Sequence, residues 1–312
     1  MQEKNYLKYA KFERTKKVSK TRKIITLILL AALLIFGCYI VPLKIQGAFF
    51  YPDNIIYDET PANQNLPFED IRFTSLDGTS LHGWFVPAQY GVADSLGTVI
   101  HMHGNAANII DHWHFSKWLP EAGYNVFIFD YRGYGQSENK TPTFKGVYED
   151  SISAINYVRS RTDIDTTKLL VLGQSLGGTN AIASIGSSRT EGDAKNGICG
   201  MVIDSTFYSY SEIVNDKLPY AGLLVNNDYG ADRYVQALSP IPLLFIHGTA
   251  DVLIPIKHSE RLYTLANEPK ELITAENIEH AMALSDYASL TNHYQNKVLS
   301  FFAQAIQNCA DN

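Results

Sequence analysis

The amino-terminal part of the chain contains an unbroken apolar run, residues 24–41, which reads IITLILLAALLIFGCYIV and carries no charge. A helix of this length rises roughly 27 Å, and the hydrocarbon layer of a bilayer is about 30 Å thick. A buried core helix of similar length usually keeps a polar stripe along one side, and this run has none. The run therefore predicts a transmembrane anchor.

Short apolar runs of a different kind recur through the rest of the chain. Five of them do not alternate with polar residues, and they begin at residues 98, 125, 168, 200 and 242: TVIHMH, NVFIFD, KLLVLG, GMVID and PLLFIH. Runs of this length are typical of strands buried on both faces of a sheet. Upstream, IRFTSLDGTSLHGWFVP alternates apolar and polar residues around Asp77-Gly78 and predicts a two-strand hairpin.

Helix-like stretches separate these runs. Apolar residues at helical spacing predict helices over 111–121, 147–161 and 286–307. The alternation of strands and helices favours an α/β fold with a mostly parallel central sheet covered by helices on both faces. Residues 205–239 interrupt this alternation with five tyrosines and no clear strand, so they form a candidate insertion.

Charge is unevenly distributed along the chain. Residues 1–23 contain nine basic residues and two glutamates, a net charge of +7, and Lys44 follows close behind the apolar run. The positive-inside rule predicts that the basic segment is cytoplasmic and that everything after Pro42 lies across the membrane. Because the whole chain carries −6, the remaining residues carry −13. Such an acidic body would repel a nucleic-acid backbone, so we expect no nucleic acid as a partner. The expected partner is the lipid bilayer, which the apolar run would contact.

A cleaved secretory signal is the alternative to an anchor. Gly37 and Cys38 could end a lipoprotein-type cleavage site. However, Phe36 is bulky for a position near a cleavage site, and the apolar run continues past Cys38 to Val41. The pattern favours a retained anchor and leaves cleavage at Cys38 open.

Three cysteines are too few for a disulfide scaffold. Because Cys38 lies in the apolar run, at most one bridge can form in the body, between Cys199 and Cys309. The sequence does not establish whether these two residues meet.

The run KLLVLGQSLGG places Ser175 between glycines, directly after a strand-like run and before the small-residue stretch TNAIASIG. This is the context of a nucleophile elbow, in which glycines allow close approach around a strained turn and the hydroxyl projects above the sheet. The pattern predicts that Ser175 is a catalytic nucleophile.

A second loop supplies donors for an oxyanion. HMHGNAAN, residues 101–108, follows another strand-like run, and the backbone N–H of Asn105 with that of Leu176 would form a two-donor hole. We expect His101 and His103 to orient or pack against neighbours, because no carboxylate or cysteine joins them at metal-site spacing. We therefore expect no metal ligands here.

An acid and a base are expected later in the chain, in the order Ser, acid, His. HGTADVLIP supplies Asp251 on a loop after a strand, and NIEHAMAL supplies His280 after the strand-like KELITA. Asp204 also ends a strand and is the rival acid, although DSTF is typical of a turn and cap. His258 and His293 lie on helix-like stretches and are expected at the surface.

Five motifs occur in order behind the apolar run: HGNAAN, DYRGYGQS, GQSLGG, DSTF and HGTADVLIP. Together they resemble the YfhR-like branch of the α/β-hydrolase superfamily over roughly residues 44–305. The resemblance implies an α/β-hydrolase fold, with a catalytic triad and an oxyanion hole at Ser175, Asp251, His280, Asn105 and Leu176. It also implies structural roles for Asp130 and Arg132. Many relatives place Gly-Asp or Gly-Gly before the catalytic His, whereas this chain has Glu279.

The expected protein is a membrane-anchored serine hydrolase, with its catalytic domain over 44–312. It would form an acyl-enzyme with a small-molecule acyl substrate and would need no metal or organic cofactor. Carboxylic ester hydrolysis is the first choice, a serine peptidase of the aminopeptidase kind is the alternative, and a catalytically silent tethered binding domain is a third reading. The tyrosine-rich insertion 205–239 is expected to cap the nucleophile, unless it is a packed surface excursion.

Overall fold

The computed structural model describes residues 20–55, 59–187, 194–285 and 291–310. The chain divides into two compact units, Met1–Gln46 and Gly47–Asn312, which are described separately. Most of the predicted basic segment, residues 1–19, lies outside the described residues, and so does the predicted start of the last helix, residues 286–290.

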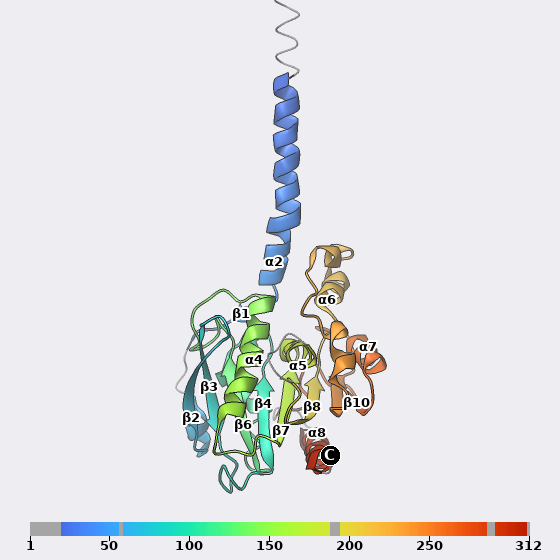
Figure 1. Ribbon diagram of the computed structural model, residues 1–312. Coiled ribbons are helices and arrows are strands. Elements are labelled where there is room, and N and C mark those ends of the chain that lie inside the picture. Colours follow the sequence, from blue (N-terminus) through green and yellow to red (C-terminus); the bar gives the residue numbers. More distant parts are fainter. Residues whose placement is uncertain (1–19, 56–58, 188–193, 286–290, 311–312) are drawn as a thin grey trace, which may run out of the picture. The chain divides into compact units, whose positions relative to one another are not determined.

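The described part of the first unit is helical and forms the blue helix of Figure 1. Residues 20–35 are α-helical, a π-helical turn follows at Phe36–Ile40, and α2 spans Val41–Gly47. The large apolar side chains between Ile24 and Phe36 are exposed all along the helix. Among the described residues, no single helix combines the length and apolar character that a membrane crossing requires.

The second unit is built on an eight-stranded sheet. Its strand order is β10-β9-β8-β7-β4-β6-β3-β2. The strands are β2 (Glu69–Thr74), β3 (Ser80–Val86), β4 (Gly97–Met102), β6 (Tyr124–Asp130), β7 (Leu169–Gln174), β8 (Ile198–Asp204), β9 (Leu243–Gly248) and β10 (Lys270–Ala275). From β10 to β6 the pairs are parallel, and β3 pairs antiparallel with both β6 and β2. The predicted mostly parallel sheet and the hairpin at Asp77-Gly78 are confirmed.

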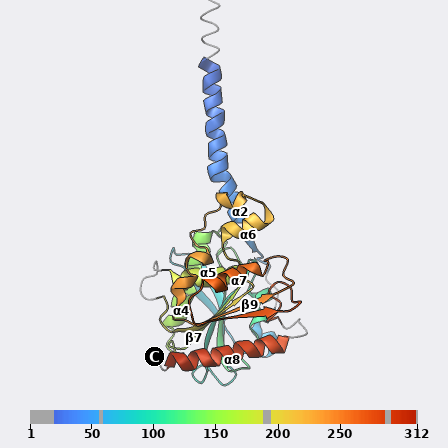
Figure 2. The same cartoon turned by 90° about the vertical axis from the view of Figure 1, so that its right-hand side faces the viewer.

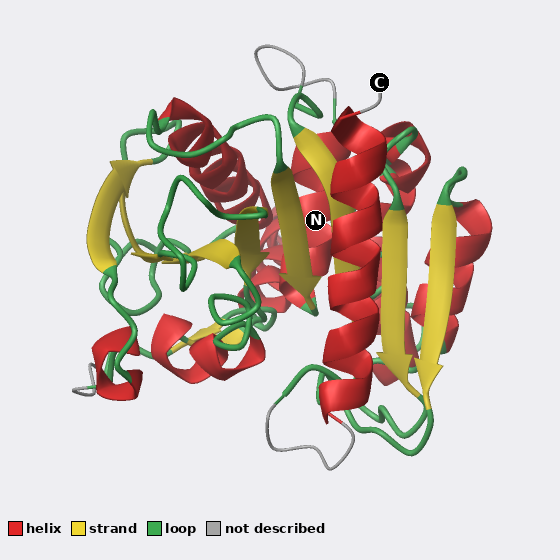
Figure 3. Cartoon of the chain, turned by 90° about the horizontal axis from the view of Figure 1, so that it is seen from below, coloured by secondary structure: helices red, strands yellow, loops and turns green. Residues whose placement is uncertain are grey.

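Helices cover both faces of this sheet (Figure 3). They are α3 (Ile109–His112), α4 (Phe144–Ser160), α5 (Leu176–Gly186), α6 (Tyr210–Lys217), α7 (Lys257–Leu265) and α8 (Thr291–Ala310). Along β7, Leu169 and Val171 join the core beneath α4, α5 and α7, whereas Leu170 and Leu172 join the core beneath α8. This period of two explains why the strand-like runs are apolar throughout, since both faces of the strand are buried.

The helix predicted over 111–121 is wrong. Only α3 and a 3-10 turn at Trp113–Phe115 form there, and the chain then continues in turns. Trp113, Phe115 and Leu119 are nevertheless buried. Their helical spacing therefore indicated buried side chains and did not indicate a long helix. The helix predicted from residue 147 starts earlier, because Thr143 caps α4 by accepting a hydrogen bond from Gly146 N at 3.0 Å.

The insertion 205–239 contains α6 and three 3-10 turns, at Ala221–Leu224, Ala231–Arg233 and Val235–Leu238. In Figure 2, α6 lies on the opposite side of the body from α8. The tyrosines do not share one surface, because Tyr210 stacks on Phe144 in the core and Tyr229 packs on Tyr148, whereas Tyr220 is exposed. Most of the tyrosine content therefore attaches the insertion to the body, and a cap over the nucleophile stays a prediction.

Two further contacts fix the ends of the body. At its start, Phe50 is buried and Phe49 packs against Phe144, while Tyr51 remains exposed. Tyr51–Pro52 forms β1, which pairs in parallel with β5 (Ala106–Ala107). Near its end, Cys199 and Cys309 form a disulfide that links β8 to α8.

Candidate active site

Ser175 lies in the sharp turn between β7 and α5. Its φ of 53° and ψ of −118° are unusual for a residue with a side chain, as expected for a strained elbow. A Cβ on Gly177 would overlap the carbonyl oxygen of Met102, and a Cβ on Gly178 would overlap Oγ1 of Thr206. The glycines therefore let α5 begin directly against the ends of the neighbouring strands.

The three residues predicted as a triad lie together. His280 Nε2 is 3.1 Å from Ser175 Oγ, and His280 Nδ1 is 2.6 Å from Asp251 Oδ2. Because a carboxylate only accepts, Nδ1 carries the proton and Nε2 presents its lone pair to the serine hydroxyl. Ser175 and Asp251 are buried, and the His280 side chain is 22% exposed, so the site opens at the histidine.

Donors surround the Asp251 carboxylate. Oδ1 accepts hydrogen bonds from Leu253 N at 2.9 Å and Ile254 N at 2.8 Å. Oδ2 contacts His280 Nδ1 and also His247 Nε2, at 3.2 Å. Burial opposes ionisation, but the hydrogen bonds from His247 and His280 outweigh it and hold the pKa of Asp251 well below its usual range. Asp251 is thus placed to remain an anion beside the imidazole.

The rival acid, Asp204, is buried at the end of β8 and makes a different set of contacts. Its Oδ1 accepts from Ser205 Oγ at 2.9 Å, and its Oδ2 has no hydrogen-bond partner within the described residues. Burial raises the pKa of Asp204 to about 6. Ser205 Oγ in turn accepts from Ala281 N at 3.1 Å, so Asp204 supports the loop that carries His280.

The loop after β4 lies against the nucleophile, because a Cβ on Gly104 would be 3.7 Å from the Cβ of Ser175. The Gly104 carbonyl oxygen accepts from His103 Nδ1 at 2.8 Å, so in a trans peptide the N–H of Asn105 points away from His103. The N–H of Leu176 belongs to the first turn of α5, where N–H groups lack an acceptor within the helix. The two amides remain the predicted donors to an oxyanion.

His112 connects the two walls of this site and was missed by the sequence analysis. Its Nε2 donates to the Ala106 carbonyl at 2.9 Å, and its Nδ1 lies 2.8 Å from the Gln174 side-chain amide. The Gln174 atom that faces Nδ1 is the amide oxygen Oε1, so both ring nitrogens face oxygens, and burial lowers the pKa of His112. No motif identified this residue, because its partners come from two separate strand ends.

The predicted positions of two further histidines are confirmed, and that of a third is wrong. His103 is buried between His112 and Tyr131, with ring centroids 4.9 and 4.5 Å away, and is a packing residue as expected. His293 is exposed as expected. His258 is not a surface residue: it is buried, with Nε2 2.9 Å from Asp216 Oδ2, because α6 covers it.

His101 is also buried, and its Nδ1 lies 3.0 Å from Ser116 Oγ. Across the described ranges, no three His, Cys, Asp or Glu side chains gather as a set of metal ligands.

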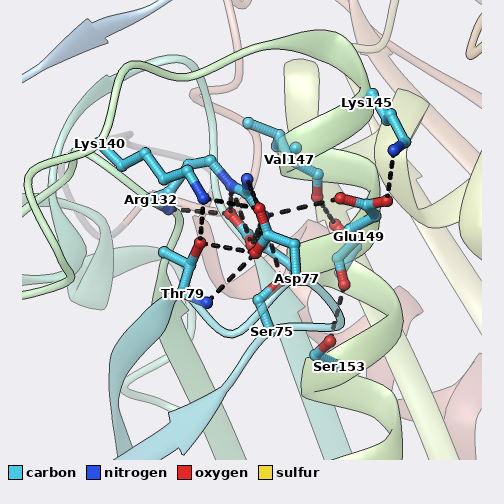
Figure 4. A network of polar contacts seen from close by, with 12 residues as sticks. Ser75, Asp77, Thr79, Arg132, Lys140, Lys145, Val147, Glu149 and Ser153 are labelled. Carbon is cyan, nitrogen blue, oxygen red and sulfur yellow. Dashed lines mark hydrogen bonds and ion pairs between the residues drawn. The ribbon is translucent and has the colours of Figure 1, made fainter.

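Arg132 is the centre of a structural network, shown in Figure 4. Its guanidinium donates to Asp150 on α4, at 2.7 Å, and to Asp77 in the β2–β3 turn, at 2.8 Å. Arg132 and Asp150 are both buried, and because Arg132 contacts both Asp77 and Asp150 it joins the edge hairpin to α4. Asp130 likewise bonds the backbone, accepting from Ile109 N at 3.0 Å. These contacts agree with the structural roles expected for both residues.

Comparison with known proteins places this site in a family. The family model described as serine aminopeptidase, S33, matches residues 93–226. The chain is 43% identical over 292 residues to the protein YfhR of Salmonella typhimurium, covering 92% of this chain and 97% of that protein. It is 44% identical over 272 residues to YfhR of Escherichia coli K12, covering 87% and 92%.

Solved structures are similar in fold. An esterase of Pyrococcus furiosus has a TM-score of 0.64 at 20% identity, over 83% of this chain and 98% of that one. Acetyl xylan esterase 1 of Thermoanaerobacterium has a TM-score of 0.58 at 15% identity, over 81% and 86%. At these identities the likeness establishes the α/β-hydrolase fold alone. Together with the identity to YfhR, it shows that the chain is a hydrolase and belongs to the YfhR family of α/β-hydrolases.

Proposed function

We propose that this chain is a serine hydrolase that cleaves carboxylic esters through an acyl-enzyme on Ser175. One observation carries the proposal: His280 bridges Ser175 Oγ and Asp251 Oδ2, at 3.1 and 2.6 Å. This is the geometry in which a histidine removes a hydroxyl proton while an acid fixes its tautomer and stabilises the imidazolium.

In the proposed reaction, Ser175 Oγ bonds to the acyl carbon and its proton moves to His280 Nε2. The backbone N–H groups of Asn105 and Leu176 stabilise the oxyanion. The ester C–O bond then breaks, and the leaving alcohol takes the proton from His280. Water attacks the acyl-enzyme by the same route, releasing the carboxylic acid and restoring the serine hydroxyl.

Two features favour an ester over a peptide with a free amino terminus. An aminopeptidase needs a carboxylate that can receive the substrate ammonium group. Asp251 already accepts from four donors, and Asp204 is fully buried, so neither of these two acids is free to serve that role. In addition, two of the solved structures with a similar fold are structures of esterases. An aminopeptidase remains the second candidate because the matching family model carries that description.

The test uses the full-length chain in detergent. A fluorophosphonate probe should label the parent and not Ser175→Ala, since the probe reacts with an activated serine. Chromogenic esters and aminoacyl amides offered in parallel should separate the two candidates. Hydrolysis of the amides alone would favour the peptidase, and equal activity in Ser175→Ala would reject the proposed nucleophile.

We also propose that residues 24–41 anchor the protein in a membrane, with the amino terminus cytoplasmic and the hydrolase unit extracytoplasmic. No single helix in the described part of the chain is long and apolar enough for this, so the α-helix up to residue 35 and the π-helical turn at Phe36–Ile40 would have to span the bilayer together. Support comes from the exposed apolar side chains between Ile24 and Phe36, which water solvates poorly. The Cys199–Cys309 disulfide is a second support, because such bonds persist mainly in oxidising compartments. Removal of the segment at Cys38 is the alternative.

A further inference from the structure

Large apolar side chains are exposed at one end of the hydrolase unit. Eleven such side chains are exposed in the described residues from Gly47 onward. Two of them, Tyr90 and Leu96, lie where β3 ends and β4 begins, at the amino end of the parallel strands. The other nine lie at the carboxyl end, where Ser175 also lies. Exposed apolar residues scattered singly are ordinary, whereas this one-sided grouping indicates a contact surface.

Six of the nine come from two segments beside the candidate active site, and we name them the apolar rim: Leu218, Tyr220, Leu223, Leu224, Val252 and Leu253. Val252 directly follows Asp251 and is 86% exposed, as is Leu223 in the 3-10 turn Ala221–Leu224 of the insertion. Lys217 Nζ donates to the Val252 carbonyl at 3.2 Å, which joins the two segments. The rim is therefore continuous with the loop that carries the candidate acid.

The chain enters the hydrolase unit at the same end. Tyr51, which is exposed, donates its N–H to the Asn105 carbonyl at 2.8 Å, so the first strand of the unit pairs with the oxyanion loop. Whatever precedes Gly47 is thus joined to the body beside the active site. The segment that precedes it contains the apolar run 24–41.

We propose that the apolar rim inserts into the surface of a lipid bilayer and that the substrate is an amphiphilic acyl ester taken from that bilayer. The inference rests on the proposed function and names its substrate class. Apolar burial drives this contact, because the chain after residue 23 carries −13 and gains no attraction from anionic headgroups. The acyl group of such an ester passes to Ser175 Oγ while the alcohol leaves with the proton from His280, and water attack then releases a fatty acid.

The first test measures insertion without reference to catalysis. Leu223→Trp and the matched control Leu96→Trp are made in the full-length chain and reconstituted in phosphatidylcholine vesicles, with and without doxyl-labelled lipid. The introduced indole at 223 should be quenched by the label and should stay quenched in high salt, whereas that at 96 should not be quenched. Equal quenching at both positions, or none at 223, would overturn the proposal.

The second test measures substrate delivery. Leu218→Ser combined with Leu223→Ser should lose about tenfold in hydrolysis of 4-nitrophenyl palmitate held in vesicles, because two large apolar groups no longer leave water. The same protein should hydrolyse soluble 4-nitrophenyl acetate like the parent, and Leu96→Ser should change neither rate. If the parent cleaves neither ester, the proposed function is wrong. If the double variant loses activity equally on both esters, only the role proposed for the apolar rim is contradicted.

Discussion

His247 lies 3.2 Å from Asp251 through Nε2, on the same carboxylate oxygen that contacts His280. Its Nε2 also donates to the Ile254 carbonyl at 2.8 Å, and its Nδ1 accepts from Ser259 Oγ at 2.7 Å. His247 is fully buried, so these contacts fix its ring. The candidate acid is therefore held by a histidine from its own strand as well as by the histidine that it orients.

This relationship makes His247 a positioning residue for catalysis. His247→Ala should lower kcat for ester hydrolysis about tenfold with little change in KM, because a hydrogen bond to a charged group is lost. The acidic limb of the pH–rate profile should move to higher pH, since one donor that lowers the pKa of Asp251 is gone. His247→Gln, which keeps an N–H donor, should recover part of the rate. If both variants lose the same fraction of kcat and their pH–rate profiles do not shift, His247 has only a structural role.

The two buried acids should respond differently to amide replacement. Asp251→Asn should reduce kcat about 10⁴-fold, as when a triad histidine adopts the wrong tautomer. Asp204→Asn should keep most of the activity, because Asp204 contacts Ser205 and not His280. Steady-state kinetics on one soluble ester compare both variants with the parent. Full activity in the Asp251 variant, with loss in the Asp204 variant, would move the acid to Asp204.

The raised pKa of Asp204 predicts a pH dependence of stability. Between the ordinary carboxyl pKa near 4 and the folded value of about 6, the folded state binds more protons than the unfolded state. The contribution of Asp204 is therefore fully present below pH 4 and is lost as the pH rises through 6. Its size is about 3 kcal/mol by the two-unit shift. Unfolding in urea from pH 4 to 7 should show this decline in the parent and not in Asp204→Asn; parallel curves would contradict it.

The disulfide should stabilise the body without supporting catalysis. It closes a loop of 110 residues, and loss of such a cross-link costs about 5 kcal/mol in the chain-entropy model. Replacing Cys199 and Cys309 together by Ala should lower the thermal midpoint, while kcat below that midpoint should be unchanged because the bond lies at the amino end of β8. Differential scanning measurements and ester assays on the same preparations check both parts. An unchanged midpoint would contradict the expected contribution.

The membrane proposal predicts a defined topology. A reporter fused after Asn312 should be active only outside the cytoplasm, and protease added from that side should digest the hydrolase body. The mature chain should keep Met1 and resist carbonate extraction. A mature form that begins at lipid-modified Cys38 would instead identify the apolar run as a lipoprotein signal.

The sequence predicted the features that depend on local pattern. The buried strands β4 and β6 to β9 were recognisable because both of their faces are apolar, and Ser175 was recognisable because the glycines around it follow such a strand. Asp251 and His280 could be proposed because each follows a strand end, where the loops of a parallel sheet converge.

Features that depend on contacts between distant elements could not be predicted in this way. The burial of His258 requires α6 to lie over α7, and the role of His247 requires the loop after β9 to fold back onto its own strand end. The pairing of Cys199 with Cys309 likewise depends on where α8 crosses the sheet. The helix at Ile109–His112 is an example of a local pattern that misled the prediction, because apolar residues at helical spacing do not by themselves make a helix continue.

The covalent loop from Cys199 to Cys309 also partitions the catalytic residues. Asp251 and His280 lie inside this loop, whereas Ser175 lies outside it. In an unfolded but oxidised chain, the acid and the base stay within one closed ring, whose accessible conformations are fewer than those of an open segment. Assembly of the site then includes an encounter between this ring and the elbow that carries the nucleophile.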